Sequence, residues 1–179
     1  MNLVTGATGI VGIRLVYDLI QKGKQVRATR RASSDMHFVR KVLNFYGLNE
    51  NQFRAIDWVE ADLSDIHSLD EALEGVETVY HAAALVSYEK KEADKLLRIN
   101  SEGTANLVNA CLSKGVKNLC HISSVSALGV EKKGLINEQT EWKRNQTRSV
   151  YGLSKSLAEQ EAWRGGAEGI NVTVMSPSV

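Results

Sequence analysis

The stretch that decides the fold is residues 1–12, MNLVTGATGIVG, in which a short apolar run meets glycines at Gly6, Gly9 and Gly12. The apolar run is typical of a buried strand, and the apolar residues after the glycines recur with the spacing of a helix. Glycine permits a tight turn and a close approach of a diphosphate to the backbone, while a helix N-terminus offers unpaired N–H groups and a partial positive charge. The stretch therefore predicts a phosphate-binding turn between a first strand and a first helix.

The same alternation of extended and helical segments continues along the chain. Strands are expected at residues 2–5, 25–29, 57–61, 78–83, 117–123 and 171–176, helices at 10–22, 36–46, 65–75, 92–113 and 150–164, and a polar loop at 131–148. Near-continuously apolar strands that alternate with helices predict a parallel, doubly wound sheet covered on both faces, the three-layer α/β/α Rossmann fold. With one proline and no linker-like stretch, residues 1–179 are expected to form one NAD(P)-binding domain.

Composition and charge exclude several classes of partner. The 22 Lys and Arg residues balance 21 Asp and Glu residues, and no basic stripe suits a nucleic-acid backbone. Cys111 and Cys120 lack the spacing of a metal or redox site, so buried free thiols in a reducing compartment are expected. No apolar run reaches the roughly 18 residues of a membrane span. We therefore expect a cytoplasmic protein with a small-molecule substrate, and neither nucleic acid, membrane nor metal as a partner.

The end of the second expected strand indicates which dinucleotide binds. An NAD site usually places an acidic residue there, where it holds the ribose 2′-hydroxyl. Here QVRAT runs into Arg30 and Arg31 instead. The planar donor forks of two guanidinium groups match a 2′-phosphate, so the sequence predicts NADP over NAD. The alternative is a solvated basic turn with no ligand.

A second group of polar residues predicts acid–base chemistry. In SVYGLSKSLAEQ, Tyr151 and Lys155 stand four residues apart on one helix face, so both polar ends enter the same cleft. A nearby ammonium group stabilises a phenolate, and Lys155 is therefore expected to lower the pKa of Tyr151. Ser123 and Ser124 close the fifth expected strand, at the sheet edge where parallel sheets bind ligands. A serine hydroxyl there is expected to hold a substrate oxygen beside Tyr151.

Together these motifs resemble the extended group of the short-chain dehydrogenase/reductase superfamily. That group holds sugar-nucleotide epimerases and dehydratases, dihydroflavonol-type reductases and hydroxysteroid dehydrogenases. The resemblance covers essentially the whole chain. It implies that Ser124, counted back from Gly129, is the catalytic serine beside Tyr151 and Lys155, and that Ser123 lies next to the nicotinamide.

The resemblance also implies a set of cofactor contacts. Asp62 and Leu63 match the family's residues beside the adenine, and HAAA at 81–84 matches its fourth-strand motif, with His81 in place of the usual asparagine. We interpret His81 as a hydrogen-bonded strand-end residue rather than a base. Asn100 matches an asparagine that organises the active site. The expected cofactor contacts are Gly6, Thr8, Gly9, Ile10, Val11, Gly12, Arg30, Arg31, Asp62, Leu63, Ala82, Ala83, Asn100, Ser123, Tyr151, Lys155 and Pro177.

The function that the resemblance implies is hydride transfer between nicotinamide C4 of NADP and a carbonyl or alcohol. Tyr151 would then move the hydroxyl proton, Ser124 would position the oxygen, and Lys155 would hold the ribose. Two alternatives stay open, namely a sugar-nucleotide epimerase with tightly bound NAD and a non-catalytic dinucleotide sensor. Val125 and Ser126 replace the Asp-Glu pair that sugar-nucleotide dehydratases tend to carry, which disfavours a dehydratase.

The family usually carries a smaller, mostly C-terminal substrate domain. Here the chain ends two residues after Pro177, so we expect residues 1–179 to be the cofactor-binding part of a longer enzyme. Extended enzymes often dimerise through the helices that match residues 92–113 and 150–164. The resemblance therefore also implies a possible homodimer.

Overall fold

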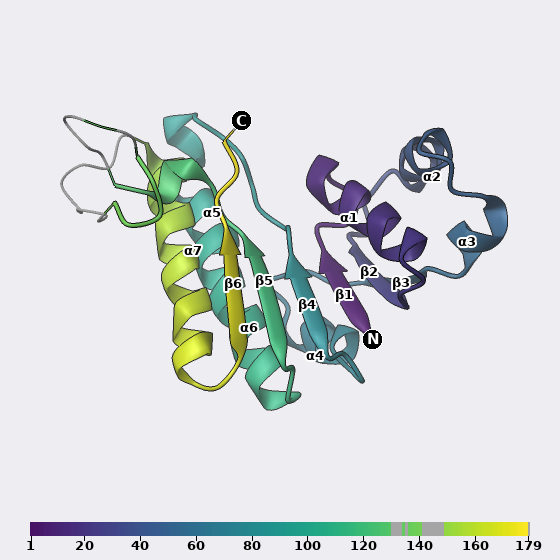
Figure 1. Cartoon of the computed structure of the whole chain (residues 1–179). Helices are drawn as coiled ribbons and strands as arrows, with labels where there is room; N and C mark the ends of the chain where they lie inside the picture. Colours follow the sequence, from purple (N-terminus) through teal and green to yellow (C-terminus); the bar gives the residue numbers. More distant parts are fainter. Residues whose placement is uncertain (130–133, 135, 141–148, 179) are drawn as a thin grey trace.

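A six-stranded parallel sheet forms the centre of the molecule (Figure 1). The computed structural model describes residues 1–129, 134, 136–140 and 149–178. Its strands follow the order β3-β2-β1-β4-β5-β6, and every neighbouring pair is parallel. The strands are β1 (Asn2–Thr5), β2 (Val26–Arg30), β3 (Asp57–Glu60), β4 (Thr78–His81), β5 (Asn118–Ile122) and β6 (Asn171–Met175). The order reverses between β1 and β4, and this switch point is where open α/β sheets bind their ligands.

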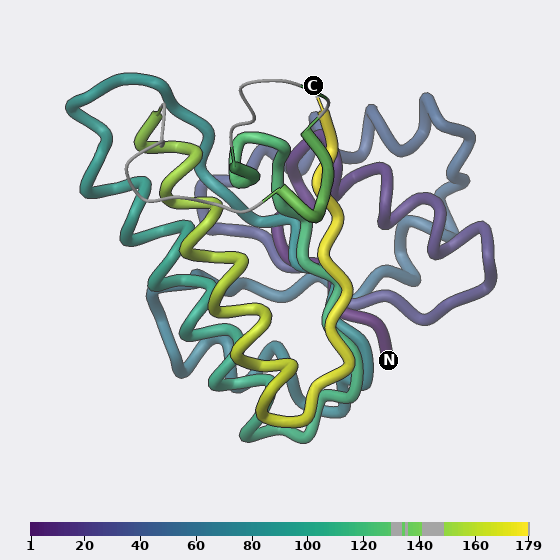
Figure 2. Tube along the Cα trace, turned by 60° about the vertical axis from the view of Figure 1, so that its left-hand side comes forward, coloured from purple at the N-terminus to yellow at the C-terminus, as the bar shows by residue number. Residues whose placement is uncertain are grey.

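Helices lie on both sides of this sheet, which confirms the predicted doubly wound fold (Figure 1). One side carries α1 (Ile10–Gln21), α2 (Met36–Phe45) and α3 (Glu50–Arg54), and the other carries α4 (Ile66–Ala72), α5 (Ala93–Leu96), α6 (Gly103–Ser113) and α7 (Val150–Ala167). Short 3₁₀ turns lie at η1 (Lys90–Glu92) and η3 (Val125–Ala127). Figure 2 shows α6 and α7 side by side along the sheet. The short helix α3 was not predicted, and its capping box between Asn49 and Gln52 explains why so few residues form it.

Two apolar cores fill the space between the sheet and its helices. Successive residues of a strand point to opposite faces, so Leu3 and Val4 of β1 are both buried but belong to different cores. Val4 packs in the core that contains Ile13 of α1, and Leu3 packs in the core that contains Leu107 of α6. The strand β1 is therefore shared by both halves of the molecule.

One layer of helices is incomplete over β4, β5 and β6. Within the described residues no helix covers the face of these strands opposite α6 and α7 (Figure 1). Burial therefore alternates along them instead of staying continuous as predicted. Tyr80, Cys120 and Thr173 lie in register across this uncovered face. The predicted three-layer arrangement is confirmed for the fold, but coverage of both faces does not extend to these strands.

The segment predicted as one helix at 92–113 changes its winding along its length. It runs from α5 through a π-helical turn, η2 (Leu97–Glu102), into α6. The hydroxyl of Thr104 donates to the carbonyl oxygen of Asn100 at 2.6 Å. A hydroxyl bonded four residues back competes with the backbone N–H and bends a helix, which accounts for the irregular turn. The polar loop predicted at 131–148 lies largely outside the described residues.

Candidate active site

The glycine turn after β1 fits a diphosphate. Gly6 has φ of +66°, and a Cβ there would lie 2.6 Å from the Cα of Ala83. A Cβ on Gly12 would lie 2.1 Å from the carbonyl oxygen of Gly6, so the third glycine lets α1 approach the turn. Gly9 precedes the helix without a side-chain cap, and the first-turn N–H groups of a helix have no partner within the helix. The turn therefore presents backbone donors to an anion.

A groove of about 340 Å³ runs along the carboxyl edge of the sheet from this turn. It brings together nine of the predicted cofactor contacts, Gly6, Thr8, Gly9, Arg30, Arg31, Asp62, Leu63, Ala82 and Ala83. The lining also includes residues that sequence reasoning missed, Thr5, Thr29, Ala61, Leu69, Ala84, Leu85, Lys95 and Ile99. Ile10, Val11, Gly12, Asn100, Ser123, Tyr151, Lys155 and Pro177 are not among its lining residues.

The two arginines at the end of β2 differ in their surroundings. Register places Glu60 of β3 opposite Arg30, and its carboxylate Oε2 lies 3.4 Å from the guanidinium Nη1 of Arg30. The described part of the chain shows no ion pair for Arg31, whose backbone N–H donates to the hydroxyl of Ser34. Both arginines line the groove, but Glu60 partly neutralises one of them. The neighbouring strand β3, rather than β2, therefore carries an acidic residue at this position of the sheet.

The predicted catalytic residues meet above the carboxyl end of β5. The helix α7 begins at Val150, because the hydroxyl of Ser149 caps it by accepting from the N–H of Gly152 at 3.0 Å. Its first turns carry Tyr151 and Lys155, whose exposed fractions are 8% and 2%. The hydroxyl of Ser124 hydrogen-bonds with the side chain of Tyr151. Ser124 and Tyr151, from two distant segments, thus meet, and Lys155 lies one turn further along α7.

Burial dominates the electrostatics of this group. It raises the pKa of Tyr151 above its usual value, against a smaller lowering by the hydrogen bond from Ser124. Burial also lowers the pKa of Lys155 to about 8, and the Nζ of this lysine donates to the carbonyl oxygen of Ile122 at 2.7 Å. The predicted lowering of the tyrosine pKa by Lys155 is therefore wrong for this structure. The ammonium group donates a hydrogen bond to Ile122 of β5, and removal of the phenol from water dominates the pKa of Tyr151.

A buried polar chain connects β1 to the helices behind the sheet. The hydroxyl of Thr5 lies 2.7 Å from Nδ1 of His81, and Nε2 of His81 lies 2.9 Å from the hydroxyl of Thr104. Burial lowers the pKa of His81 to about 3, so the imidazole is neutral at physiological pH. These contacts agree with the interpretation of His81 as a hydrogen-bonded strand-end residue.

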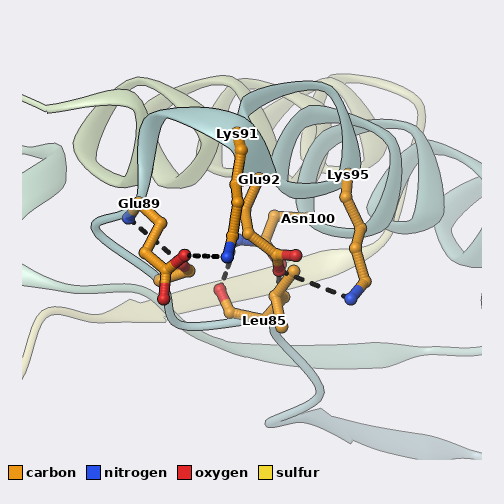
Figure 3. A network of polar contacts seen from close by, with 7 residues as sticks. Leu85, Glu89, Lys91, Glu92, Lys95 and Asn100 are labelled. Atoms are coloured by element: carbon orange, nitrogen blue, oxygen red, sulfur yellow. Dashed lines mark hydrogen bonds and ion pairs between the residues drawn. The ribbon is translucent and has the colours of Figure 1, made fainter.

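Asn100 holds the segment that follows β4 (Figure 3). Its Oδ1 accepts from the N–H of Leu85 at 2.7 Å, and its Nδ2 donates to the carbonyl oxygen of Leu85 at 2.9 Å. The same Nδ2 donates to the hydroxyl of Ser154 at 2.9 Å. This amide therefore joins a residue of the groove wall to the helix that carries Tyr151 and Lys155.

Ser123 and Pro177 lie at the carboxyl ends of β5 and β6. The hydroxyl of Ser123 donates to Oε2 of Glu159 at 2.9 Å, and the carbonyl oxygen of Pro177 accepts from the N–H of Val125 at 3.3 Å. Their contact with a nicotinamide stays a prediction. Among the described residues no three His, Cys, Asp or Glu side chains come together as metal ligands, and no helix is long and apolar enough to cross a membrane.

Comparisons with known proteins agree with this arrangement. Residues 2–179 match the NAD dependent epimerase/dehydratase family. The chain is 34% identical over 177 residues to sterol demethylase protein B of Methylococcus capsulatus, covering 99% of this chain and 50% of that protein. It is 35% identical over 176 residues to a putative dihydroflavonol 4-reductase of Synechocystis, covering 98% and 48%. The chain thus spans about half the length of the curated relatives it matches.

A solved structure extends the comparison to ligands. MoeE5 in complex with UDP-glucose and NAD is 29% identical to this chain, with a TM-score of 0.75, and the match covers 97% of this chain and 52% of that one. A nicotinamide dinucleotide is therefore found in a protein with a similar fold.

Proposed function

This chain belongs to the NAD-dependent epimerase/dehydratase family of short-chain dehydrogenases/reductases, and on that premise we propose that it is the cofactor-binding part of an NADP-dependent oxidoreductase. The substrate is a small molecule with a carbonyl or alcohol group. The proposal rests on Ser124 and Tyr151, which hydrogen-bond to each other, and on the buried Lys155 one turn further along α7, whose Nζ donates to the end of β5. A protein that only sensed a dinucleotide would need the groove but not these three side chains.

The residues of the site divide the work. The cofactor supplies a hydride acceptor or donor at its nicotinamide. The glycine turn and the N-terminus of α1 hold its diphosphate, and Asp62 and Leu63 flank its adenine. Ser124 orients the substrate oxygen through its hydroxyl. An ordinary tyrosine already keeps its proton at neutral pH, and burial raises the pKa of Tyr151 further, so its hydroxyl can donate a proton to a developing alkoxide. Lys155 keeps a positive charge close to the site.

Replacing Tyr151→Phe tests the proposed chemistry. The phenylalanine keeps the packing of the ring but has no proton to move, so we expect turnover to fall by roughly 10² to 10⁴-fold. The measurement is the absorbance of the reduced nicotinamide during reaction of the full-length enzyme with a panel of ketones and secondary alcohols. NADPH affinity, measured by calorimetry, serves as the control and is expected to stay within about twofold. Turnover near that of the wild type would overturn the proposal.

The preference for NADP rests on Arg31. Its guanidinium lines the groove without an ion pair among the described residues, whereas Arg30 faces Glu60. We expect NADPH to bind more tightly than NADH. We also expect Arg31→Gln to weaken the affinity for NADPH by roughly tenfold and to leave the affinity for NADH unchanged. Arg14→Gln, a change of the same charge on α1 where Arg14 pairs with Asp18, is the control. Tighter binding of NADH by the wild type would contradict the proposed preference.

A sugar-nucleotide epimerase is the second candidate function. The observation that favours it is the similarity to MoeE5, which holds UDP-glucose and NAD. The partial neutralisation of Arg30 by Glu60 also leaves the end of β2 less positive than its sequence indicates. NAD that remains bound through purification of the full-length protein, identified by mass spectrometry, would favour the epimerase.

A further inference from the structure

One positively charged residue of the groove, Lys95, lies outside the motifs identified in the sequence. Lys95 of α5 lines the same groove as Gly6 and Gly9, and its side chain is 50% exposed. Leu85 and Ile99 belong to the same wall of the groove. The donors of the glycine turn carry no formal charge, so Lys95 adds a cation to a site that suits an anion.

The segment that carries Lys95 is held firmly at both ends (Figure 3). Asn100 bonds both backbone groups of Leu85, so the start and the end of the wall are joined through one amide. Leu96, the residue next to Lys95, is completely buried. The lysine therefore extends from a fixed helix, and only its own side chain has to move to reach a ligand.

Lys95 is only loosely paired within the protein. Its Nζ lies 3.4 Å from Oε2 of Glu92, whereas Lys91, one turn earlier, lies 2.7 Å from Glu89 (Figure 3). Charge-assisted hydrogen bonds usually measure about 2.7–2.9 Å, so the hydrogen bond from Lys95 to Glu92 is a long and weak one. Within the described residues Glu92 is the one ion-pair partner of Lys95. Most of the hydrogen-bonding capacity of the ammonium group thus remains for a ligand.

The sheet order places the segment that carries Lys95 next to the glycine turn rather than next to Arg31. Arg31 follows β2, and the wall segment follows β4, which flanks β1 on the side away from β2. The glycine turn follows β1, between them. We propose that Lys95 binds the diphosphate of the dinucleotide from the wall that faces the glycine turn. The inference rests on the proposed function, because it needs a dinucleotide in this groove.

Substitution of Lys95→Gln tests the assignment, with Lys91→Gln as the matched control. Both variants remove one positive charge from the same segment, but Lys91 does not line the groove. NADPH, NADH and adenosine 2′-monophosphate are titrated by calorimetry into the full-length protein. Because a half-exposed cation is partly screened, we expect Lys95→Gln to weaken NADPH and NADH equally, by roughly 3- to 10-fold. Adenosine 2′-monophosphate, which lacks the diphosphate, and the control variant are expected to show no change.

Glu92→Gln gives a second readout that does not depend on how well the first variant folds. Removing the negative charge of Glu92 is expected to strengthen the binding of NADPH and of NADH by about twofold. Unchanged NADPH affinity in Lys95→Gln would overturn the assignment, as would a loss confined to NADPH or a loss shared by adenosine 2′-monophosphate. Failure of the wild type to bind either dinucleotide would instead overturn the proposed function, and this inference with it.

Discussion

Lys155 illustrates how burial sets the chemistry of a single side chain. Only 2% of the residue is exposed, and its pKa of about 8 lies well below the usual 10.5. At neutral pH the amine still carries its proton, so the folded protein holds a charge that water would solvate better. The carbonyl oxygen of Ile122 and the nearby Glu159 compensate only in part. The site thus contains a residue that opposes folding.

Replacing Lys155→Met removes this charge and keeps the length of the side chain. A pKa lowered to about 8 corresponds to a cost of about 3 kcal/mol at pH 7, and we expect the variant to gain about 1–3 kcal/mol of stability while it loses turnover. Urea unfolding at pH 7 measures the gain.

The pH dependence supplies a separate check on Lys155. Between pH 8 and 10.5 the unfolded chain binds the proton and the folded chain does not, so wild-type stability should rise with pH across this range. Lys155→Met should lack that rise. A variant less stable than the wild type at pH 7 would show that the buried amine stabilises the fold.

Residues differ in how well the sequence predicts their roles. The glycine turn and the Tyr151-Lys155 pair are predictable because the spacing along one chain segment already determines their geometry. The roles of Glu60 and Lys95 are not predictable from the sequence. The position of Glu60 depends on which strand pairs with β2, and that of Lys95 depends on the path of the chain after β4. The pKa of Tyr151 is unpredictable for a similar reason, since burial and the direction of the Lys155 side chain arise only on folding.

At the scale of one element, the turn from β1 into α1 depends on the absence of side chains. A Cβ on Gly12 would meet Gly6 at 2.1 Å, while one on Gly9 would make only an ordinary contact at 3.4 Å. The two glycines therefore serve different purposes. Gly12 allows the helix to pack, and Gly9 leaves the helix N-terminus open to a ligand.

Alanine substitutions separate these two purposes. Gly12→Ala is expected to cost about 1–3 kcal/mol of stability, because backbone atoms must move to admit the methyl group. Gly9→Ala is expected to retain stability within about 0.5 kcal/mol and to lose NADPH affinity. Thermal unfolding and calorimetric titration of both variants give the comparison. Equal stability of the two variants would contradict the packing role of Gly12.

Element boundaries show the same limit of sequence reasoning. Leu96, Asn100, Thr104, Leu107 and Cys111, which share one face at helical spacing, are all buried. The π-helical turn in this segment was not predicted, because the periodicity of the sequence reveals neither that turn nor the hydrogen bond from Thr104 to Asn100.

For the whole molecule, two buried histidines make stability depend on pH. Burial lowers the pKa of His81 to about 3 and that of His121 well below its usual value, and their rings lie 5.1 Å apart. Among the described residues neither ring nitrogen of His121 has a hydrogen-bond partner. The unfolded chain therefore binds protons below pH 6.5 that the folded chain excludes.

Acidification is expected to destabilise the protein through both rings. The stability that the neutral histidines contribute is fully present above pH 6.5 and is lost as the pH falls toward 3. For His81 alone, about 2 kcal/mol is lost at pH 5. Urea unfolding at pH 7 and pH 5 measures the difference. His121→Leu should reduce it, and the exposed His67→Gln should not. An equal loss in all three proteins would assign the effect to other groups.

The overall architecture is predictable from the alternation of strands and helices, because each apolar strand must be covered and parallel strands need crossovers. The uncovered face of β4, β5 and β6 is not predictable from the sequence, because an apolar residue in a strand does not indicate which side of the sheet a helix will cover. The proposed homodimer through α6 and α7 likewise depends on a surface that the pattern alone does not define.

The strand β1 has a consequence for cooperativity. Leu3 and Val4 are adjacent residues of one strand, but each packs in a different core. Neither core can therefore unfold while the other core keeps β1 in place. Parts of a protein that unfold independently are separated by a boundary with few contacts across it. Here the boundary between the two cores is a central strand of the sheet. The two halves of the sheet should therefore exchange their amide hydrogens with solvent through one shared opening event.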